Sequence, residues 1–568
     1  EAETADETNF SPRTAEGPAE VLSGGRWLVE TLTDVGQVKA RLGQGRHLKY
    51  RFALAQAGTY TFWLRLGYES ARPTLAWRLD DGVWREIKPT ELTINLTFVS
   101  NDCQIGWVRA GTLDLTAGYH TLELRADQPH ANRFLLALDV FALVPGDWTP
   151  DGPLPPGQLP SSERDRQAAA TVFTFPASTA AVPDRVVLPL DGLWQVCRDD
   201  DPDMDQGTYE PARALPAKPI WRGVRVPSDL RETPALNMAH RVWYRCRVDV
   251  PAAYAGRSFV LDFAGTNWIA SVVVNGRFVG WHKSTRVPWQ LDITTAVKPG
   301  EINEILVGIK DPWYAIDAPS LKKTLDDCRH IPAEDFRNLR FVAPIFPSTK
   351  GDADGTACGL TDPVRLVVAG GPVYVADVFI RTTVTDAANA PVNKTITAEI
   401  TLANPSDLPA EVAVGAEAVF AGDGRVEKEL APVEAEVPAG GSAVVTLSAP
   451  WPEARLWWPG DDPAAMYTLR TTVFLGGKAV DRHEQPFGFR AVKIDGPYIR
   501  INGLRRNFWN LLGGLSGKTP EEALAHFRRG NNRFERFGAD LGLGKWFPTR
   551  REQLDWTDRH GIPGRLST

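Results

Sequence analysis

The sequence predicts a mainly β, multidomain protein whose last segment switches to alternating strands and helices. Apolar residues alternate at Phe259, Leu261 and Phe263, and the same period-2 pattern recurs over 305–309, as in half-buried strands. Between them Asn275-Gly276 is a dipeptide that accepts positive φ and closes a hairpin. These patterns predict two β-sandwiches, a jelly roll between them, and the start of an incomplete (β/α)₈ barrel.

Length and charge narrow the class of protein. A chain of 568 residues exceeds what one core supports, so several domains are expected. With 63 basic and 70 acidic side chains the net charge is −7, which argues against nucleic acid or a membrane surface as the main partner. Nineteen Trp suit surfaces that stack on sugar rings, although any single Trp more often belongs to a core. A neutral partner therefore fits this composition better.

The cysteines and the N-terminus bear on the cellular compartment. Five widely spaced cysteines without a CxxC pair indicate neither a zinc knuckle nor a dense disulfide framework. No apolar run reaches the ~20 residues that span a bilayer. No signal peptide is visible at Glu1, and a cleaved one would leave no trace. We expect a secreted or periplasmic protein whose signal has been removed.

Four successive regions and a connector follow from the pattern. Residues 1–145 predict a β-sandwich, with strands at 50–54, 59–68, 76–87, 120–126 and 134–144. Pro, Gly and charged residues then predict a semi-rigid linker over 146–169. The jelly roll is expected over 170–372, an immunoglobulin-like sandwich over 373–488, and the barrel start over 489–568.

Four phrases of the jelly-roll region resemble the sugar-binding domain of glycoside hydrolase family 2, which includes β-galactosidases, β-glucuronidases and β-mannosidases. They occur in family order and are LDGLWQV (190–196), WYR (243–245), VNGRFVG (274–280) and LDITTAVKPGEINEILV (291–307). The phrase RLWWPG near residue 457 resembles the end of the family's second domain and leans toward its β-mannosidase and exo-glucosaminidase branch. The resemblance implies an exo-acting retaining β-glycosidase that needs no cofactor for catalysis.

The last segment predicts barrel strands at 506–512, 531–538 and 562–568, separated by two helices. The helices are expected over 519–530, with Thr519 as N-cap, and over 549–561. Retaining glycoside hydrolysis needs two carboxyl groups ~5 to 5.5 Å apart, one a general acid and one a nucleophile. In the resembled family these are glutamates after the fourth and seventh barrel strands, so both are expected beyond residue 568.

Candidate substrate-binding residues lie near the expected barrel face and in a long connection over 311–362. Asn510, Glu535 and Arg536 end predicted barrel strands, where substrate groups bind in such barrels. Family members often have an arginine where this sequence has Glu535. Trp313 and Tyr314 lie in the long connection, which the resemblance places near the active-site mouth. The alternative is that this connection is a surface loop that packs on itself.

The first region resembles carbohydrate-binding modules of families 6 and 35. The similar stretches are EAE at the N-terminus, AGTYTFWLR (57–65), AGYHTLELR (117–125) and LDVFALV (138–144). The resemblance implies a structural calcium, for which Glu1, Glu3 and Asp139 occupy the matching positions and supply hard oxygen donors; the alternative is solvated terminal glutamates and a turn aspartate. The candidates for sugar stacking, with the core as the alternative for each, are Trp77, Trp84 and Trp107.

Two functions from different classes remain open at this stage. The first is a glycosidase tethered to polysaccharide by its N-terminal module. The second is a non-catalytic glycan-binding or scaffold protein that keeps the sandwiches. Three barrel strands alone would leave an open sheet edge, so a longer polypeptide, a homo-oligomer or a further chain that completes the barrel is expected, unless the tail after about residue 500 is poorly folded.

Overall fold

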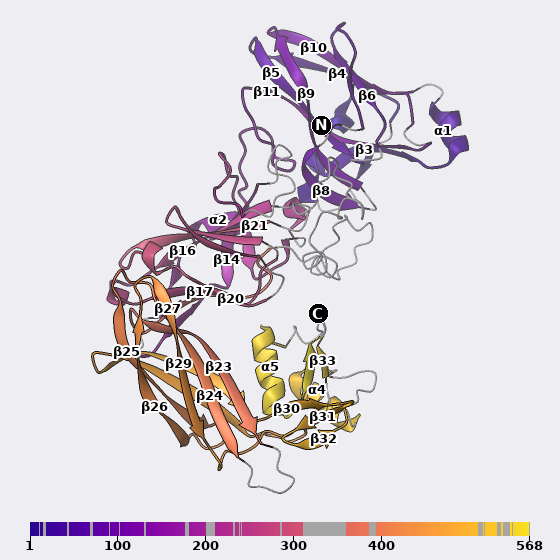
Figure 1. Ribbon diagram of the computed structural model, residues 1–568. Helices are drawn as coiled ribbons and strands as arrows, with labels where there is room; N and C mark the ends of the chain where they lie inside the picture. The colour runs from indigo at the N-terminus through magenta and orange to yellow at the C-terminus, as the bar shows by residue number, and fades with distance from the viewer. Residues whose placement is uncertain are drawn as a thin grey trace.

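The computed structural model describes residues 1–310 and 359–568 apart from short stretches, and its strands and helices form four successive units (Figure 1). The short stretches left out are 11, 15–18, 43–44, 69–71, 90, 92, 101–102, 130–131, 177–180, 200–210, 231–232, 238, 240, 268, 284–286, 386–392, 509–514, 516, 531–534, 538–545, 548 and 567–568. In Figure 1 the N-terminal unit lies at the top and the C-terminal helices at the lower right. None of the described helices is long and apolar enough to span a membrane.

The N-terminal unit packs two antiparallel sheets face to face. The five-stranded sheet has the order β1 (Glu7–Thr8), β4 (Arg46–Leu54), β10 (Gly118–Ala126), β6 (Leu75–Leu79), β7 (Arg85–Ile87). The six-stranded sheet has the order β2 (Pro12–Thr14), β3 (Arg26–Leu32), β11 (Phe134–Pro145), β5 (Gly58–Gly67), β9 (Cys103–Leu115), β8 (Ile94–Ser100). Helix α1 (Val35–Leu42) follows β3. Inward residues such as Leu64, Leu122 and Leu136 form one buried cluster, so the alternation predicted the core face.

The second unit has the predicted jelly-roll character, with one large and one small sheet over a common core. The large sheet has the order β15 (Arg222–Val226), β14 (Gly192–Arg198), β16 (Arg241–Asp249), β21 (Ile302–Lys310), β18 (Ile269–Val274), β19 (Arg277–Lys283), and β12 (Phe173–Thr174) pairs with β16. The small sheet has the order β13 (Val186–Pro189), β22 (Val364–Val368), β17 (Phe259–Phe263), β20 (Trp289–Asp292). Asn275 and Gly276 close the β18–β19 hairpin with φ of +50° and +79°, which those residue types tolerate.

The third unit is a sandwich of a three-stranded and a four-stranded antiparallel sheet. The first has the order β23 (Tyr374–Val384), β24 (Lys394–Asn404), β27 (Gly441–Pro450). The second has the order β26 (Val426–Val437), β25 (Ala410–Phe420), β28 (Met466–Leu475), β29 (Lys478–Gly488). Ile396, Ile400, Val414 and Leu469 are among the buried residues between the sheets.

The C-terminal segment begins with a small antiparallel sheet and then adopts a strand–helix–strand arrangement. The small sheet is formed by β30 (Val492–Asp495), β31 (Tyr498–Ile501) and β32 (Leu504–Arg506). After it come α4 (Pro520–Arg529), β33 (Glu535–Phe537), α5 (Arg550–Arg559) and β34 (Gly564–Leu566). The hydroxyls of Thr519 and Thr549 cap the two helices, and Thr549 forms a reciprocal capping box with Glu552. Most of the strand expected over 506–512 lies outside the described residues.

The connector over 146–169 is more than a spacer, because it packs against both neighbouring units. Its end forms helix α2 (Glu163–Ala170), capped by Ser162, and Asp165 accepts a hydrogen bond from Gly223 N on β15 at 2.7 Å. Trp107 Nε1 donates to Gly152 O at 2.9 Å, on the side of the N-terminal unit. Its proline-rich composition did not predict this docking.

The N-terminal and jelly-roll units also contact one another directly through buried polar groups. Arg198 of β14 donates to the carbonyls of Leu96 in β8 and Ala235 at 2.8 and 3.1 Å. Next to this contact, Arg222 of β15 forms an ion pair with Asp151 of the connector, whose side chain is almost fully buried. The N-terminal unit is therefore fixed on the jelly roll by specific contacts.

Candidate functional site

Strands β33 and β34 form a parallel pair that α5 connects. Glu535 pairs with Gly564 and Phe537 with Leu566. Parallel strands joined by a helix have their carboxyl ends at one edge, where (β/α)₈ enzymes bind substrate. Glu535 and Arg536 lie on β33, whereas Asn510, Trp313 and Tyr314 lie outside the described residues. Two of the five predicted substrate-binding positions therefore lie among the described residues, as neighbours on one strand.

Helix α5 is anchored on the immunoglobulin-like unit by a buried tryptophan. The indole Nε1 of Trp457 donates to the backbone carbonyl of Asp558 at 2.7 Å, and the Trp457 side chain is 2% exposed. Arg490 makes two hydrogen bonds to the Asp558 carboxylate, at 2.9 and 3.1 Å, and its guanidinium lies 4.5 Å from the centre of the Trp457 ring. The phrase RLWWPG therefore supplies the tryptophan on which α5 packs.

Asp462, in the loop before β28, contacts residues at the ends of both α4 and α5. Its carboxylate contacts Arg528 near the end of α4 and His560 Nδ1 just after α5, the latter at 2.7 Å. Burial alone would raise the pKa of Asp462, but the hydrogen bonds from Arg528 and His560 outweigh it and lower the pKa. One carboxylate thus fixes the C-terminal ends of two helices.

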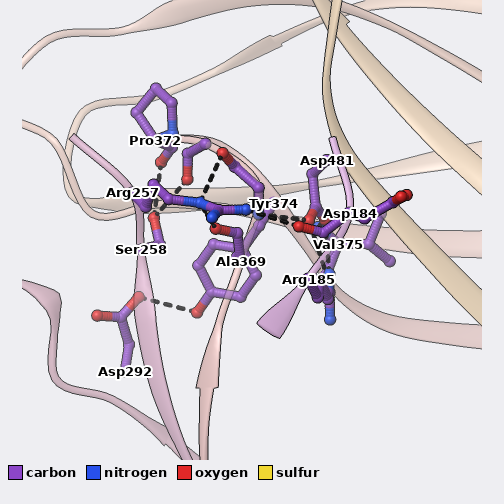
Figure 2. A network of polar contacts seen from close by, with 12 residues as sticks. Asp184, Arg185, Arg257, Ser258, Asp292, Ala369, Pro372, Tyr374, Val375 and Asp481 are labelled. Atoms are coloured by element: carbon purple, nitrogen blue, oxygen red, sulfur yellow. Dashed lines mark hydrogen bonds and ion pairs between the residues drawn. The ribbon is translucent and has the colours of Figure 1, made fainter. Parts of the chain in front are cut away.

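The jelly-roll and immunoglobulin-like units are joined by a polar network around Asp481 (Figure 2). The Asp481 side chain is fully buried in β29 and accepts hydrogen bonds from Gly370 N and Val375 N at 3.0 and 2.9 Å. Arg185 donates to both of its oxygens. This gives the carboxylate four donors, which offsets the cost of burying its charge.

A second arginine crosses beside this network. Arg257 Nε donates to the carbonyl of Ala369 at 2.9 Å, and its Nη2 donates to the carbonyl of Asp184 at 2.6 Å (Figure 2). Tyr374 donates its hydroxyl proton to Asp292 at 2.8 Å, and burial together with that carboxylate raises the pKa of Tyr374. None of these junction residues was singled out from the sequence, because each is a single polar residue in an otherwise ordinary strand or turn.

Helix α5 also contacts the jelly roll, so it touches two supporting units. Arg365 of β22 forms an ion pair with Glu552 at 3.2 Å. Arg551 donates to Gln485 Oε1 of β29 at 2.6 Å. Helix α5 thus makes polar contacts with both the jelly roll and the immunoglobulin-like unit.

The three tryptophans proposed for sugar stacking differ in burial. Trp77 and Trp107 are 1% and 2% exposed and belong to the interior, so neither presents a ring face to a ligand. Trp84 is partly exposed, and its ring contacts the guanidiniums of Arg78 and Arg125 at 4.8 and 4.2 Å from the ring centre. Of the three, Trp84 alone keeps an accessible side chain.

The predicted calcium ligands meet around the turn at Ser23–Gly25. Ser23 Oγ donates to Glu1, and a Cβ placed on Gly24 would lie 3.5 Å from Glu3 Oε1. Glu3 Oε2 is buried without a hydrogen-bond partner, so the two glutamates supply oxygen donors of the kind calcium takes. The third predicted ligand, Asp139, forms an ion pair with Arg65.

Asp139 is paired with a buried arginine. Arg65 Nη1 donates to it at 2.6 Å, Ser23 N donates at 2.9 Å, and both charged side chains are fully buried. Burial raises the pKa of Asp139 to about 6 although Arg65 opposes the shift. Within the described ranges, no three His, Cys, Asp or Glu side chains gather closely enough to form a metal centre.

These sandwiches and the helix seated on them define the class of fold: a mainly β, multidomain protein that ends in a short parallel β–α–β segment. Comparison with family models matches residues 189–324 to the sugar binding domain of glycosyl hydrolases family 2 and residues 373–490 to glycosyl hydrolases family 2. Both matched stretches are therefore similar to domains of glycosyl hydrolases family 2. The family predicted from the jelly-roll phrases is confirmed.

Curated relatives include a β-glucuronidase from Paenibacillus borealis, 25% identical over 405 residues that cover 68% of this chain and 59% of the relative. A β-galactosidase from Thermoanaerobacter pseudethanolicus is 38% identical over 77 residues, 14% of this chain and 10% of the relative. The chain thus spans about three fifths or less of these relatives. A solved β-glucuronidase from Bacteroides uniformis aligns with a TM-score of 0.46 and 15% identity, covering 67% of this chain and 42% of that one.

Proposed function

We propose that this chain serves in a retaining, exo-acting β-glycosidase that removes terminal β-linked sugars from oligo- or polysaccharides. The observation that carries the proposal is the order of units: both family domains are followed by the β33–α5–β34 crossover, seated on them by Trp457 and Asp462. Two sandwiches that hold the first helices of a barrel are a support for chemistry performed on that barrel.

The proposed reaction uses two carboxyl groups on barrel strands that follow β34. One protonates the leaving oxygen and the other attacks the anomeric carbon, and both must be held ~5 to 5.5 Å apart on a rigid frame. The role of the described residues is to provide that frame. Glu535 and Arg536 on β33 are the proposed substrate contacts among them, since the carboxyl ends of such strands meet the ligand.

The experiment is an assay of the full-length protein, purified from its natural source, against p-nitrophenyl β-glucuronide, β-galactoside, β-mannoside and β-glucosaminide, together with the intact mass of that polypeptide. The names of the relatives favour the glucuronide and the galactoside as first substrates. Release of p-nitrophenol from one glycoside supports the proposal. A mass of 62.5 kDa with no release from any of them would instead favour a non-catalytic glycan-binding or scaffold protein.

For the N-terminal unit we propose carbohydrate binding through the exposed side of Trp84, which would hold polysaccharide near the barrel. Two arginines under or beside an indole fix its orientation, and a partly exposed indole gives a flat apolar face for a sugar ring. Glu1 and Glu3 are the proposed ligands of a structural calcium. A secreted or periplasmic location remains a proposal, consistent with polysaccharide as the target.

A further inference from the structure

His120, at the start of β10, has an oxygen acceptor at each of its two ring nitrogens. Nδ1 lies 2.9 Å from Asp80 Oδ2, and Nε2 lies 2.9 Å from the backbone carbonyl of Thr116. A neutral imidazole carries one N–H and one lone pair, so it can satisfy only one of these acceptors. Only the imidazolium donates to both, and the side chain is 6% exposed, so water has little access to the unmatched position.

Three described groups contact the ring of His120, and Asp80 is the charged one among them. The end of β6 presents Asp80, the turn before β10 presents the Thr116 carbonyl, and β4 presents the ring of Phe52, 5.8 Å away between ring centres. The hydrogen bond to Asp80 and then that to Thr116 raise the pKa of His120, while burial opposes them. The geometry and the charges therefore both favour the protonated ring.

Asp80 also closes the loop that follows β6 onto β10. Asp80 N donates to Thr121 O at 2.7 Å, and Asp80 Oδ1 accepts from Thr121 N at 2.8 Å. Asp80 has a φ of +51°, a conformation that aspartate tolerates better than most residues. Three of the contacts that hold this loop thus pass through one residue, and His120 faces its carboxylate.

The loop leads directly to the exposed aromatic surface of the N-terminal unit. Val83 is 85% exposed, and Trp84 contacts Arg78 of β6 and Arg125 of β10. Movement of residues 80–84 would therefore displace Trp84 from its two arginines. Asp80, which holds the loop on β10, and Trp84, which is proposed to stack on sugar, are four positions apart.

We propose that His120 is a proton-operated latch: its imidazolium holds the 80–84 loop on β10 and thereby keeps Trp84 in place for a carbohydrate ligand. The second half of this inference rests on the proposed function of Trp84. When the ring loses its proton, a nitrogen lone pair faces either the Thr116 carbonyl or the Asp80 carboxylate. That repulsion weakens the closed loop.

The direction of the pH dependence follows from the direction of the His120 pKa shift. The pKa is higher in the closed loop than in an open one, where it is near the ordinary value of about 6.5. The added stability of the closed loop is therefore fully present below that value and is lost as pH rises through the closed-state pKa. The closing equilibrium changes by about tenfold for each unit between the two pKa values.

The test combines an NMR titration of the histidine side chains with hydrogen exchange of the 80–84 loop and Thr121 between pH 5 and 9. In the whole chain we expect exchange of the Thr121 amide, corrected for intrinsic rate, to rise with the titration of His120. His120→Gln and Asp80→Asn should each give fast exchange already at pH 5. Asp80→Asn keeps an oxygen acceptor for Thr121 N, so it guards against general misfolding. The matched control is His47→Gln, an exposed histidine on neighbouring β4.

Binding to polysaccharide separates the latch from the carbohydrate proposal. If binding weakens above the pH at which His120 titrates, and Trp84→Ala abolishes it, both proposals are supported. If Trp84→Ala binds as the parent does while exchange still follows His120, the latch stands and the ligand role of Trp84 fails. Exchange that is independent of pH, or unchanged in both His120→Gln and Asp80→Asn, would overturn the latch.

Discussion

Arg185 donates from Nε and Nη2 to the two carboxylate oxygens of Asp481, at 3.0 and 2.6 Å, although the residues are 296 positions apart. The pair joins the residue just before β13 of the jelly roll's small sheet to β29, an edge strand of the immunoglobulin-like sandwich (Figure 2). Because both side chains are largely or wholly buried, each needs the other as a partner. The two support units therefore share one electrostatic junction.

Asp481→Asn should destabilise the chain by about 3 to 5 kcal/mol, because Arg185 would lose its counter-charge in a buried position. Urea unfolding followed by far-UV circular dichroism measures the effect. The matched control is Asp184→Asn, which breaks the exposed ion pair with Arg482 and should cost under about 1 kcal/mol. Equal effects of the two substitutions would contradict the importance of the junction.

Trp457→Ala should free helix α5 from the immunoglobulin-like unit, because it removes both a buried ring and the donor to Asp558 O. A loss of about 3 to 5 kcal/mol is expected for truncating a buried tryptophan. Hydrogen exchange of residues 550–559 should rise more than that of β24 in the sandwich core. Trp457→Phe keeps most of the apolar contact and should show a smaller rise in exchange. If the exchange of α5 is unchanged in both variants, residues other than Trp457 hold this helix in place.

Acid should loosen the clamp formed by Asp462. The pKa of Asp462 is lowered in the fold, so its contribution is present above the ordinary value near ~4 and is lost as pH falls through the lower, folded-state value. We expect exchange at the C-terminal ends of α4 and α5 to increase over that acidic range. Asp462→Asn should show the loosened state already at pH 7, whereas Asp461→Asn, an exposed neighbour, should behave as the parent does.

Calcium should stabilise the N-terminal unit if Glu1 and Glu3 bind it. At a free calcium concentration of 100 times Kd the expected gain is about 2.7 kcal/mol, seen as a higher Tm of that unit. Glu3→Gln should remove most of the gain, because Glu3 Oε2 is the buried oxygen without a protein partner. Glu7→Gln, an exposed change on β1, is the control. A Tm that does not respond to calcium or EDTA would remove the proposal.

The parts of the fold that could be predicted from the sequence were mostly those that short sequence patterns determine. Alternation predicted the strands, Asn275-Gly276 predicted a hairpin, and Thr519 predicted a helix start, because each depends on neighbours within a few positions. The polar residues that join the units, such as Asp481, could not be found from short sequence patterns. Asp481 is one acidic residue in a strand, and its donors come from residues more than 100 positions away.

The tryptophans show the same division between local and distant information. Trp77 shares the inward face of β6 with Leu75, so alternation already favoured the core. Trp107 is covered partly by the docked connector, through Gly152 and a ring contact with Trp148, which no local pattern reveals. The position of Trp84 over two arginines likewise depends on the pairing of β6 with β10.

Trp84→Ala should lower binding of the chain to its polysaccharide by roughly tenfold or more without reducing its stability, because the ring contributes a stacking face but is only partly buried. Affinity electrophoresis in gels that contain soluble polysaccharides measures the retardation, and thermal unfolding measures stability. Trp77→Ala is the matched control, since loss of a core ring should cost about 3 to 5 kcal/mol whether or not a ligand is present. If retardation persists in the folded Trp84→Ala variant, another surface of the chain binds the polysaccharide.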